Sequence, residues 1–147
     1  AEGMRRRVLV ASGLWPLPPK TDLKARVFDW SDHDGYSVAK VHFEAFPGYL
    51  VTGNLYQPSR TVEGKIPAVI NPHGHWAEGR LADDDRGSVP ARCIAFARLG
   101  MVAFSYDMAG YVDSRQLTMN WGHSGGNLSA EERLRQHLWG IHPFGVQ

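Results

Sequence analysis

The 147-residue sequence has little cysteine and almost no net charge. Its single cysteine, Cys93, cannot form an internal disulfide bond or a cysteine-based metal site, and it leaves the redox compartment open. There are 16 basic and 15 acidic residues, which gives a formal net charge of +1. Because such a balance creates no general field for phosphate backbones or anionic lipids, we expect no nucleic-acid partner. The basic run Arg5-Arg6-Arg7 is typical of a solvated tail.

The sequence also lacks a long apolar run. No stretch approaches the roughly 20 residues that cross a bilayer, so we expect no membrane partner. The N-terminus has no apolar core of a signal peptide, although a mature product beginning at Ala1 would have lost one. Export therefore stays undecided. With 43% hydrophobic and 21% charged residues, the composition is that of a globular protein with at most one modest core.

We predict that residues 1–35 form an N-terminal extended arm and that residues 36–147 form a partial domain. The segment 11–20 is rich in proline and mixes Trp15 with ring-locked backbone, which favours an extended chain over a surface. In 36–45 apolar and polar residues alternate, as in a strand with one solvated face. A Pro-Gly turn and a second β-rich run at 49–56 complete a predicted antiparallel hairpin.

The next segments predict a strand, a helix and a second strand. Residues 66–70 form a short apolar run without alternation, typical of a strand covered on both faces. Residues 88–99 are predicted to be a helix, because Pro90 lies near their start and Gly100 just past their end. Residues 101–106 are another apolar run of strand length. This order is a βαβ unit, which implies a parallel sheet.

The last predicted element is a helix that begins at Ser129, where Glu132 completes a capping box, and runs through Leu138. No strand follows to receive this helix. We therefore expect the C-terminal half of the domain to be missing, with an open sheet edge at the strand 101–106 that this missing half or another chain covers.

The segment Asn71-Pro72-His73-Gly74-His75-Trp76 follows the first strand of the βαβ unit directly. Ligands of open α/β sheets bind beyond the carboxyl ends of the strands, so this loop lies where a site is expected. Gly74 allows a ligand to approach the backbone closely. A His-Gly start at this position is used by hydrolases to aim main-chain N–H groups at an oxyanion, commonly worth about 3 kcal/mol per donor.

Several blocks in this order resemble the N-terminal part of bacterial α/β-hydrolases of the acetyl xylan esterase and dienelactone hydrolase group. The resemblance covers nearly the whole chain and is specific for the family but weak for any one substrate. The blocks that carry it are residues 13–18, 47–56, 67–76 with Gly79-Arg80, 106–114 and 138–140.

The resemblance implies an α/β fold, specifically the N-terminal half of an α/β-hydrolase in which an antiparallel hairpin leads into a parallel βαβ sheet. It implies a serine-type carboxylic ester hydrolase without a cofactor, acting on an acetylated sugar, another small carboxylic ester or a lactone. In the oxyanion-hole loop, which comprises His73, Gly74, His75 and Trp76, the backbone N–H of His75 is the implied donor, and Trp76 shapes the substrate pocket.

The same resemblance places a second loop beside the site. Asp107 and Gly110 match a loop that closes one side of the substrate pocket in such hydrolases. The alternative is that Asp107 only hydrogen-bonds its own turn.

Gly122-His123-Ser124-Gly125-Gly126 satisfies the nucleophile motif G-x-S-x-G, and Glu132 and His137 follow it in the order acid, histidine. A nucleophile elbow needs a strand directly before the serine and a helix directly after it, and the sequence predicts neither. We therefore interpret Ser124 as part of a glycine-rich loop and expect the true nucleophile, acid and histidine beyond Gln147.

Two other functions remain open at the sequence level. His73 and His75 could bind a metal in a metal-dependent hydrolase, with the shell completed by Asp83-Asp84-Asp85 or His123, although the three aspartates beside Arg86 are typical of a solvated loop. A non-catalytic carbohydrate-binding module could instead use the aromatic side chains Trp15, Trp30, Tyr36, Tyr49 and Trp76.

Overall fold

The computed structural model describes residues 2–17, 20–60 and 63–114. The predicted helix that begins at Ser129 lies outside the described residues. So do Ser124, with its G-x-S-x-G motif, and the two residues that follow it in triad order, Glu132 and His137. No helix among the described residues is long and apolar enough to cross a bilayer.

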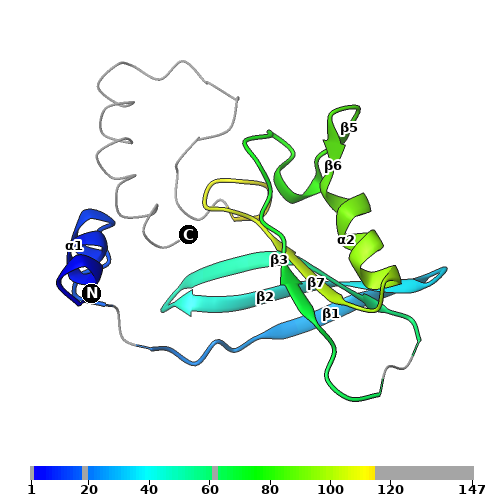
Figure 1. The fold of residues 1–147 in the computed structure, drawn as a ribbon, viewed down its shortest axis with the longest axis horizontal. Helices are drawn as coiled ribbons and strands as arrows, with labels where there is room; N and C mark the ends of the chain where they lie inside the picture. The colour runs from blue at the N-terminus through cyan, green and yellow to red at the C-terminus, as the bar shows by residue number, and fades with distance from the viewer. Residues whose placement is uncertain (1, 18–19, 61–62, 115–147) are drawn as a thin grey trace.

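A five-stranded mixed sheet organises the described part of the chain (Figure 1). Its strand order is β1-β2-β3-β7-β4, and β7 pairs antiparallel with β3 but parallel with β4. Glycines at positive φ, Gly35 at 81° and Gly48 at 79°, turn the chain between the first three strands. The strands are β1 (Arg26–His33), β2 (Tyr36–Phe46), β3 (Tyr49–Pro58), β4 (Ala68–Ile70) and β7 (Val102–Tyr106).

The predicted antiparallel hairpin is confirmed, because β2 and β3 pair from Tyr36↔Pro58 to Phe46↔Tyr49. The predicted extended arm of residues 1–35 contains more regular structure than expected. Helix α1 (Glu2–Ala11) lies at its start, at the opposite end of the molecule from α2 in Figure 1. Strand β1 lies at its end, because the tight turn at Gly35 lets it pair with β2. The described residues between α1 and β1, 12–17 and 20–25, contain no helix or strand.

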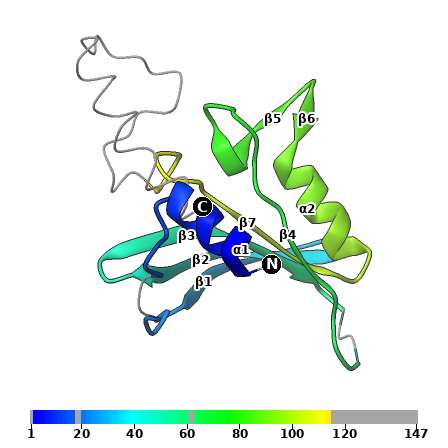
Figure 2. The ribbon, with the colours of Figure 1, turned by 60° about the vertical axis from the view of Figure 1, so that its left-hand side comes forward.

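The predicted βαβ unit is confirmed as β4, α2 (Val89–Arg98) and β7. Ser88 caps the helix, since its Oγ accepts a hydrogen bond from the Ala91 N–H at 3.0 Å. The helix ends before Gly100, which has a φ of 92°. Figure 2 shows α2 on one side of the sheet. The core there consists of Tyr56, Cys93, Ala97 and Ala103.

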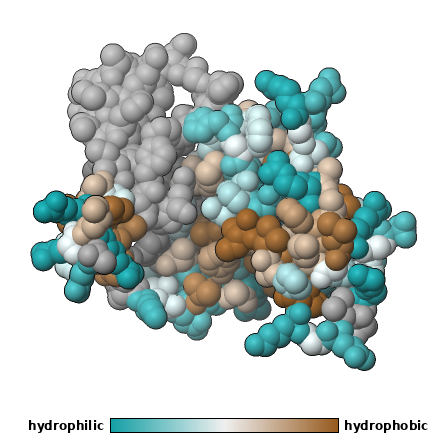
Figure 3. Space-filling view, in the orientation of Figure 1, coloured by the Kyte–Doolittle hydropathy of each residue, from teal (hydrophilic) through white to brown (hydrophobic). Residues whose placement is uncertain are grey.

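The prediction that the strand at 66–70 is covered on both faces is wrong for the described residues. The strand has only three residues, and the side chain of Ile70 is 70% exposed. The reason is the strand order, which inserts β7 between β3 and β4. Within the described residues β4 therefore forms the open edge of the sheet, and the prediction that the strand at 101–106 forms it is wrong. Figure 3 shows apolar surface over the region of β4 and α2, where Leu99 is also exposed.

Between β4 and α2 the chain forms three short elements. They are the 3-10 helix η1 (Gly79–Leu81) and the two-residue strands β5 (Asp83–Asp84) and β6 (Gly87–Ser88), which pair with each other. Helix η1 begins after two residues that follow the predicted oxyanion-hole loop, and it contributes a buried arginine to the site described below.

Candidate active site

Two loops meet at one edge of the sheet because they follow parallel strands. The first, residues 71–76, follows β4, and the second, residues 107–114, follows β7. Parallel strands end at the same edge, which is where α/β sheets bind ligands. The loops are joined by a hydrogen bond in which the Met108 N–H donates to His73 Nε2 at 3.2 Å.

The imidazole of His73 is buried and hydrogen-bonded through both nitrogens. Nδ1 lies 2.7 Å from the carbonyl oxygen of Gly74, which can only accept, so Nδ1 carries the proton. Nε2 accepts from Met108 and is therefore unprotonated. Burial lowers the pKa of His73 below its ordinary 6.5, outweighing the Gly74 hydrogen bond that raises it, and the Arg80 charge lowers it further. His73 is thus a neutral structural element at pH 7.

Gly74 is required by its neighbour Trp76. A Cβ on Gly74 would lie 2.8 Å from the indole carbons Cζ3 and Cη2 of Trp76, so the ring lies directly against the backbone of the loop. The side chain of His75 is exposed, with its ring centroid 6.1 Å from that of Tyr111. Among the residues that the structure describes, none accepts a hydrogen bond from the His75 N–H.

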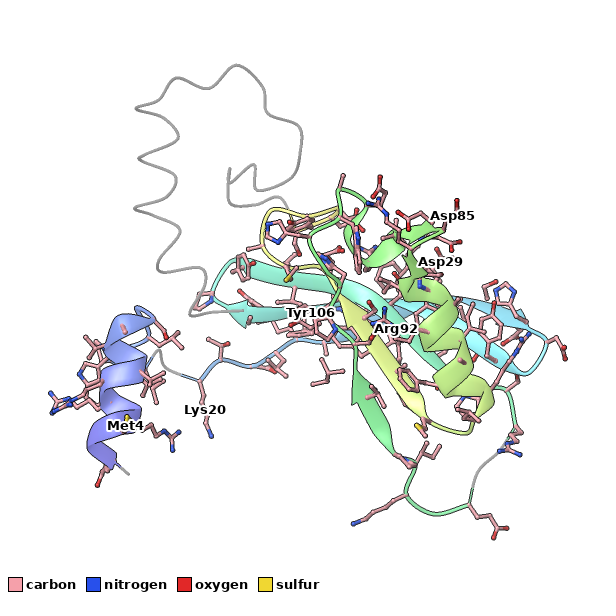
Figure 4. All side chains as sticks on the ribbon, turned by 45° about the horizontal axis from the view of Figure 1, so that its top comes forward. Met4, Lys20, Asp29, Asp85, Arg92 and Tyr106 are labelled. Carbon is pink, nitrogen blue, oxygen red and sulfur yellow. The ribbon has the colours of Figure 1, made fainter. Side chains whose placement is uncertain are left out.

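Asn71 fixes the start of the first loop. Its N–H donates to the carbonyl oxygen of Phe104 at 2.8 Å, which extends the pairing of β4 with β7 by one bond. Its Oδ1 accepts from Arg92 Nη1 at 3.2 Å, and its Nδ2 donates to Cys93 Sγ at 3.2 Å. Arg92, labelled in Figure 4, reaches this position from α2. The loop is therefore anchored both to the sheet and to the helix.

A buried guanidinium, Arg80 from η1, connects the region after the first loop to the second loop. It donates to the carboxylates of Asp107 and Asp113, the latter at 2.7 Å, and to the side-chain oxygen of Asn54 on β3. Arg80 is 7% exposed and the Asp107 side chain is fully buried. The arginine therefore ties β3, η1 and the loop after β7 into one unit.

Asp107 has further partners inside the protein. Its Oδ2 accepts from Thr52 Oγ1 at 2.9 Å and from the Asp113 N–H at 3.3 Å. The second of these is a bond to its own turn, but Asp107 does not bond to that turn alone, because Thr52 and Arg80 also donate to it. Gly110, at a φ of 87°, closes the same turn by donating its N–H to the carbonyl oxygen of Ser114 at 2.8 Å.

No family model and no curated protein matches the sequence. Solved structures do match. Methylesterase BT1017 is 29% identical with a TM-score of 0.61, over 77% of this chain and 24% of that protein. A protein from Bacteroides fragilis NCTC 9343 assigned as an acetyl xylan esterase is 15% identical with a TM-score of 0.65, over 96% and 37%. Acetyl xylan esterase 1 from Thermoanaerobacterium sp. JW/SL YS485 is 17% identical with a TM-score of 0.56, over 98% and 42%.

The chain has part of an α/β-hydrolase fold. The predicted fold class and the resemblance to acetyl xylan esterases are thereby confirmed, and the structural neighbours are esterases. The chain spans less than half the length of each of these three proteins.

Within this partial α/β-hydrolase fold, the predicted site residues lie at one edge of the sheet but at different depths. Gly74, His75 and Trp76 are partly or fully exposed, whereas His73 and Asp107 are buried. Arg80, Thr52 and Ser114 were not among the predicted site residues. The hydroxyl groups of Thr52 and Ser114 lie 3.1 Å apart. All three residues lie in blocks that carry the resemblance, namely 47–56, Gly79-Arg80 and 106–114, and those blocks were the available signal.

The metal-binding alternative requires free histidine nitrogens, and the geometry of His73 does not supply one. Both ring nitrogens of His73 already form hydrogen bonds, one with the Gly74 carbonyl and one with the Met108 N–H. Asp84 binds Arg86, with 3.1 Å between Oδ2 and Nη2. Over residues 2–17, 20–60 and 63–114, no three His, Cys, Asp or Glu side chains converge to hold an ion. His123 lies outside the described residues.

Proposed function

We propose that this chain supplies the oxyanion-hole side of a serine-type carboxylic ester hydrolase, with the His75 N–H as donor. One observation carries the proposal. The loop after β4 presents the His75 N–H, without an acceptor among the described residues, at the edge where the parallel strands β4 and β7 end. A backbone donor at this place is the arrangement that stabilises the oxyanion of acyl transfer.

The proposed reaction is attack of a serine on the ester carbonyl, formation of an acyl-enzyme, and hydrolysis of that intermediate by water. As the carbonyl oxygen becomes an oxyanion, the His75 N–H donates to it, and so does the N–H that follows the nucleophile in this fold. The nucleophile, the acid and the catalytic histidine are proposed to come from outside the described residues. Such chemistry requires no cofactor.

The proposed substrate is a small-molecule or carbohydrate ester. Two of the compared proteins bear the name acetyl xylan esterase and one bears the name methylesterase, which supports a carboxylic ester as the bond that is cleaved. Trp76 is partly buried and lies against Gly74, so its indole forms a flat apolar wall beside the proposed donor. We place the acyl or alcohol part of the substrate against this wall.

The free edge of β4 leads to a proposal about the sheet. Among the described residues β4 pairs only with β7, and Ile70 at its end is 70% exposed. Unpaired edges and exposed apolar side chains favour a covering segment. We propose that a strand carrying the nucleophile, from the same polypeptide or a second chain, pairs with β4 and closes the site.

The test compares three variants of the complete protein in hydrolysis of p-nitrophenyl acetate. His75→Ala keeps the backbone donor, and His75→Pro removes it. We expect kcat to fall by about 10²–10³-fold in His75→Pro, the usual cost of losing one oxyanion donor, and by far less in His75→Ala. Ala77→Pro is the matched control, because it places proline inside the turn closed by the Gly79 N–H and the Trp76 carbonyl, at 3.0 Å.

Equal and complete loss in His75→Ala and His75→Pro would instead assign the function to the imidazole. Stoichiometric zinc that leaves the protein together with its activity would favour a metal-dependent hydrolase. If Ala77→Pro loses as much activity as His75→Pro, the effect reflects loop damage and the donor assignment fails.

A further inference from the structure

We infer that His73 is a positioning residue that sets the direction of the His75 N–H, through its hydrogen bond to the Gly74 carbonyl. The inference rests on the proposed function and adds to it a residue that makes no contact with substrate. Its starting point is the distance of 2.7 Å between His73 Nδ1 and the carbonyl oxygen of Gly74.

The geometry of the peptide unit transmits this contact. The carbonyl of Gly74 and the N–H of His75 belong to the same peptide group, which is planar. Among the described residues the only cis peptide bond is Trp15-Pro16, so the bond between Gly74 and His75 is trans. In a trans peptide the C=O and N–H bonds point in opposite directions. Because His73 draws the Gly74 oxygen inward, the His75 N–H must point away from the buried imidazole, toward the open side of the loop.

The imidazole can hold the carbonyl only if it is itself held, and it is fixed from several sides. The Met108 N–H donates to Nε2, which sets the tautomer that leaves the proton on Nδ1. The ring of Tyr111 meets the imidazole edge-on, with centroids 4.7 Å apart. A Cβ on Gly79 would lie 3.4 Å from Nε2, so the backbone of η1 also closes on the ring.

Burial is the main reason that the ring of His73 stays neutral, and the charges around it act in the same direction. Its titratable and charged neighbours are Arg80 from η1 and His75 from the same loop, and both disfavour a second proton on the imidazole. The phenol of Tyr111 packs against it from the loop after β7. A doubly protonated ring could no longer accept the Met108 N–H, so protonation would release the contact that orients the imidazole.

Two substitutions that introduce an amide side chain test the two hydrogen bonds of His73 separately. The amide of asparagine lies near the position of Nδ1, so His73→Asn can still donate to the Gly74 carbonyl. The amide of glutamine lies near the position of Nε2, so His73→Gln can accept from Met108 but cannot hold Gly74. In the complete protein we expect His73→Leu and His73→Gln to lower kcat by about 10²–10³-fold with KM changed by less than about threefold, as for the loss of one oxyanion donor. His73→Asn should recover kcat to within about tenfold of the wild type.

A second measurement does not depend on activity. In the protein labelled with 15N in histidine, the nitrogen shifts of His73 should report a neutral ring protonated at Nδ1, with a slowly exchanging Met108 amide. A ring protonated at Nε2, or equal kcat in His73→Asn and His73→Leu, would overturn the inference. The inference would also be overturned if His73→Leu and His73→Gln raised KM and lowered the unfolding midpoint but left kcat unchanged. A protein that shows the expected tautomer but hydrolyses no ester refutes the proposed function, whereas an active His73→Leu enzyme refutes only the positioning role.

Discussion

Replacing Arg80 by methionine would leave a buried carboxylate without its cationic partner. The arginine is 7% exposed and the Asp107 side chain is fully buried, so water cannot replace the lost charge. Among the described residues, Thr52 and the Asp113 N–H would remain as the donors to Oδ2. Removing one partner of a buried pair typically costs about 3–5 kcal/mol, because the other charge stays uncompensated in a poorly solvated site. We therefore expect Arg80→Met to lower the free energy of unfolding by about this amount.

The matched control is Arg86→Met, which removes an ion pair of the same chemistry from the surface. Its side chain is 81% exposed and that of its partner Asp84 is 43% exposed, so solvent screens the pair and little stability should be lost. Arg80→Lys keeps the charge but not the planar fork that reaches three acceptors, and should lie between the wild type and Arg80→Met.

Urea unfolding of the complete protein, followed by tryptophan fluorescence, measures the difference. Adding Asp107→Asn to Arg80→Met removes the orphaned charge, and should recover part of the lost stability. The reasoning is refuted if Arg80→Met costs no more than Arg86→Met, or if Asp107→Asn makes the Arg80→Met variant less stable still.

Three further predictions follow from single residues. Burial lowers the pKa of His73 below its ordinary 6.5 in the folded protein, so below pH 6.5 the unfolded chain binds more protons at this residue than the folded chain does. The contribution of His73 to stability is therefore complete above pH 6.5 and is lost as the pH falls through the folded-state pKa. The free energy of unfolding should therefore fall between pH 7 and pH 5 by more in the wild type than in His73→Asn, and equal slopes would contradict this. Gly79→Ala should destabilise the protein by more than Gly48→Ala in thermal unfolding, because both glycines have positive φ but only a Cβ on Gly79 would meet Val112 Cγ2, at 2.8 Å. A fluorophosphonate probe should modify a serine other than Ser124, and an adduct mapped by mass spectrometry to the Ser124 peptide would make that serine the nucleophile.

The sequence predicted elements whose signals are local. The hairpin of β2 and β3, the helix α2 with its Ser88 cap, and the strand β7 follow from alternation, capping residues and apolar runs. The exposure of β4 could not be predicted in this way, because an apolar run does not reveal whether a strand lies in the middle of a sheet or at its edge. Strand β1 was missed because Val27, Phe28 and Trp30 belong to an exposed strand that is held by its pairing with β2 rather than by burial.

In the candidate site, too, the features with a local sequence signal were predicted and those that depend on tertiary contacts were not. The place of the loop at 71–76 follows from its position after a strand, and Gly74 follows from the need for close approach. The network around Arg80 joins Asn54, Asp107 and Asp113, which lie 26, 27 and 33 positions away in the sequence. Such a network depends on tertiary contacts that no local pattern encodes. The role of His73 was hidden for the same reason, since its partner Met108 lies 35 positions away.

The most direct test of the proposed site is a crystal structure of the complete protein after inactivation by a phosphonate ester, whose tetrahedral phosphorus mimics the intermediate. We predict that the phosphonyl oxygen lies about 2.7–3.1 Å from the backbone nitrogen of His75, with the imidazole of His73 still bonded to the Gly74 carbonyl. A phosphonyl oxygen that makes no contact with residues 73–76, or a metal ion held by the imidazoles of His73 and His75, would contradict the account.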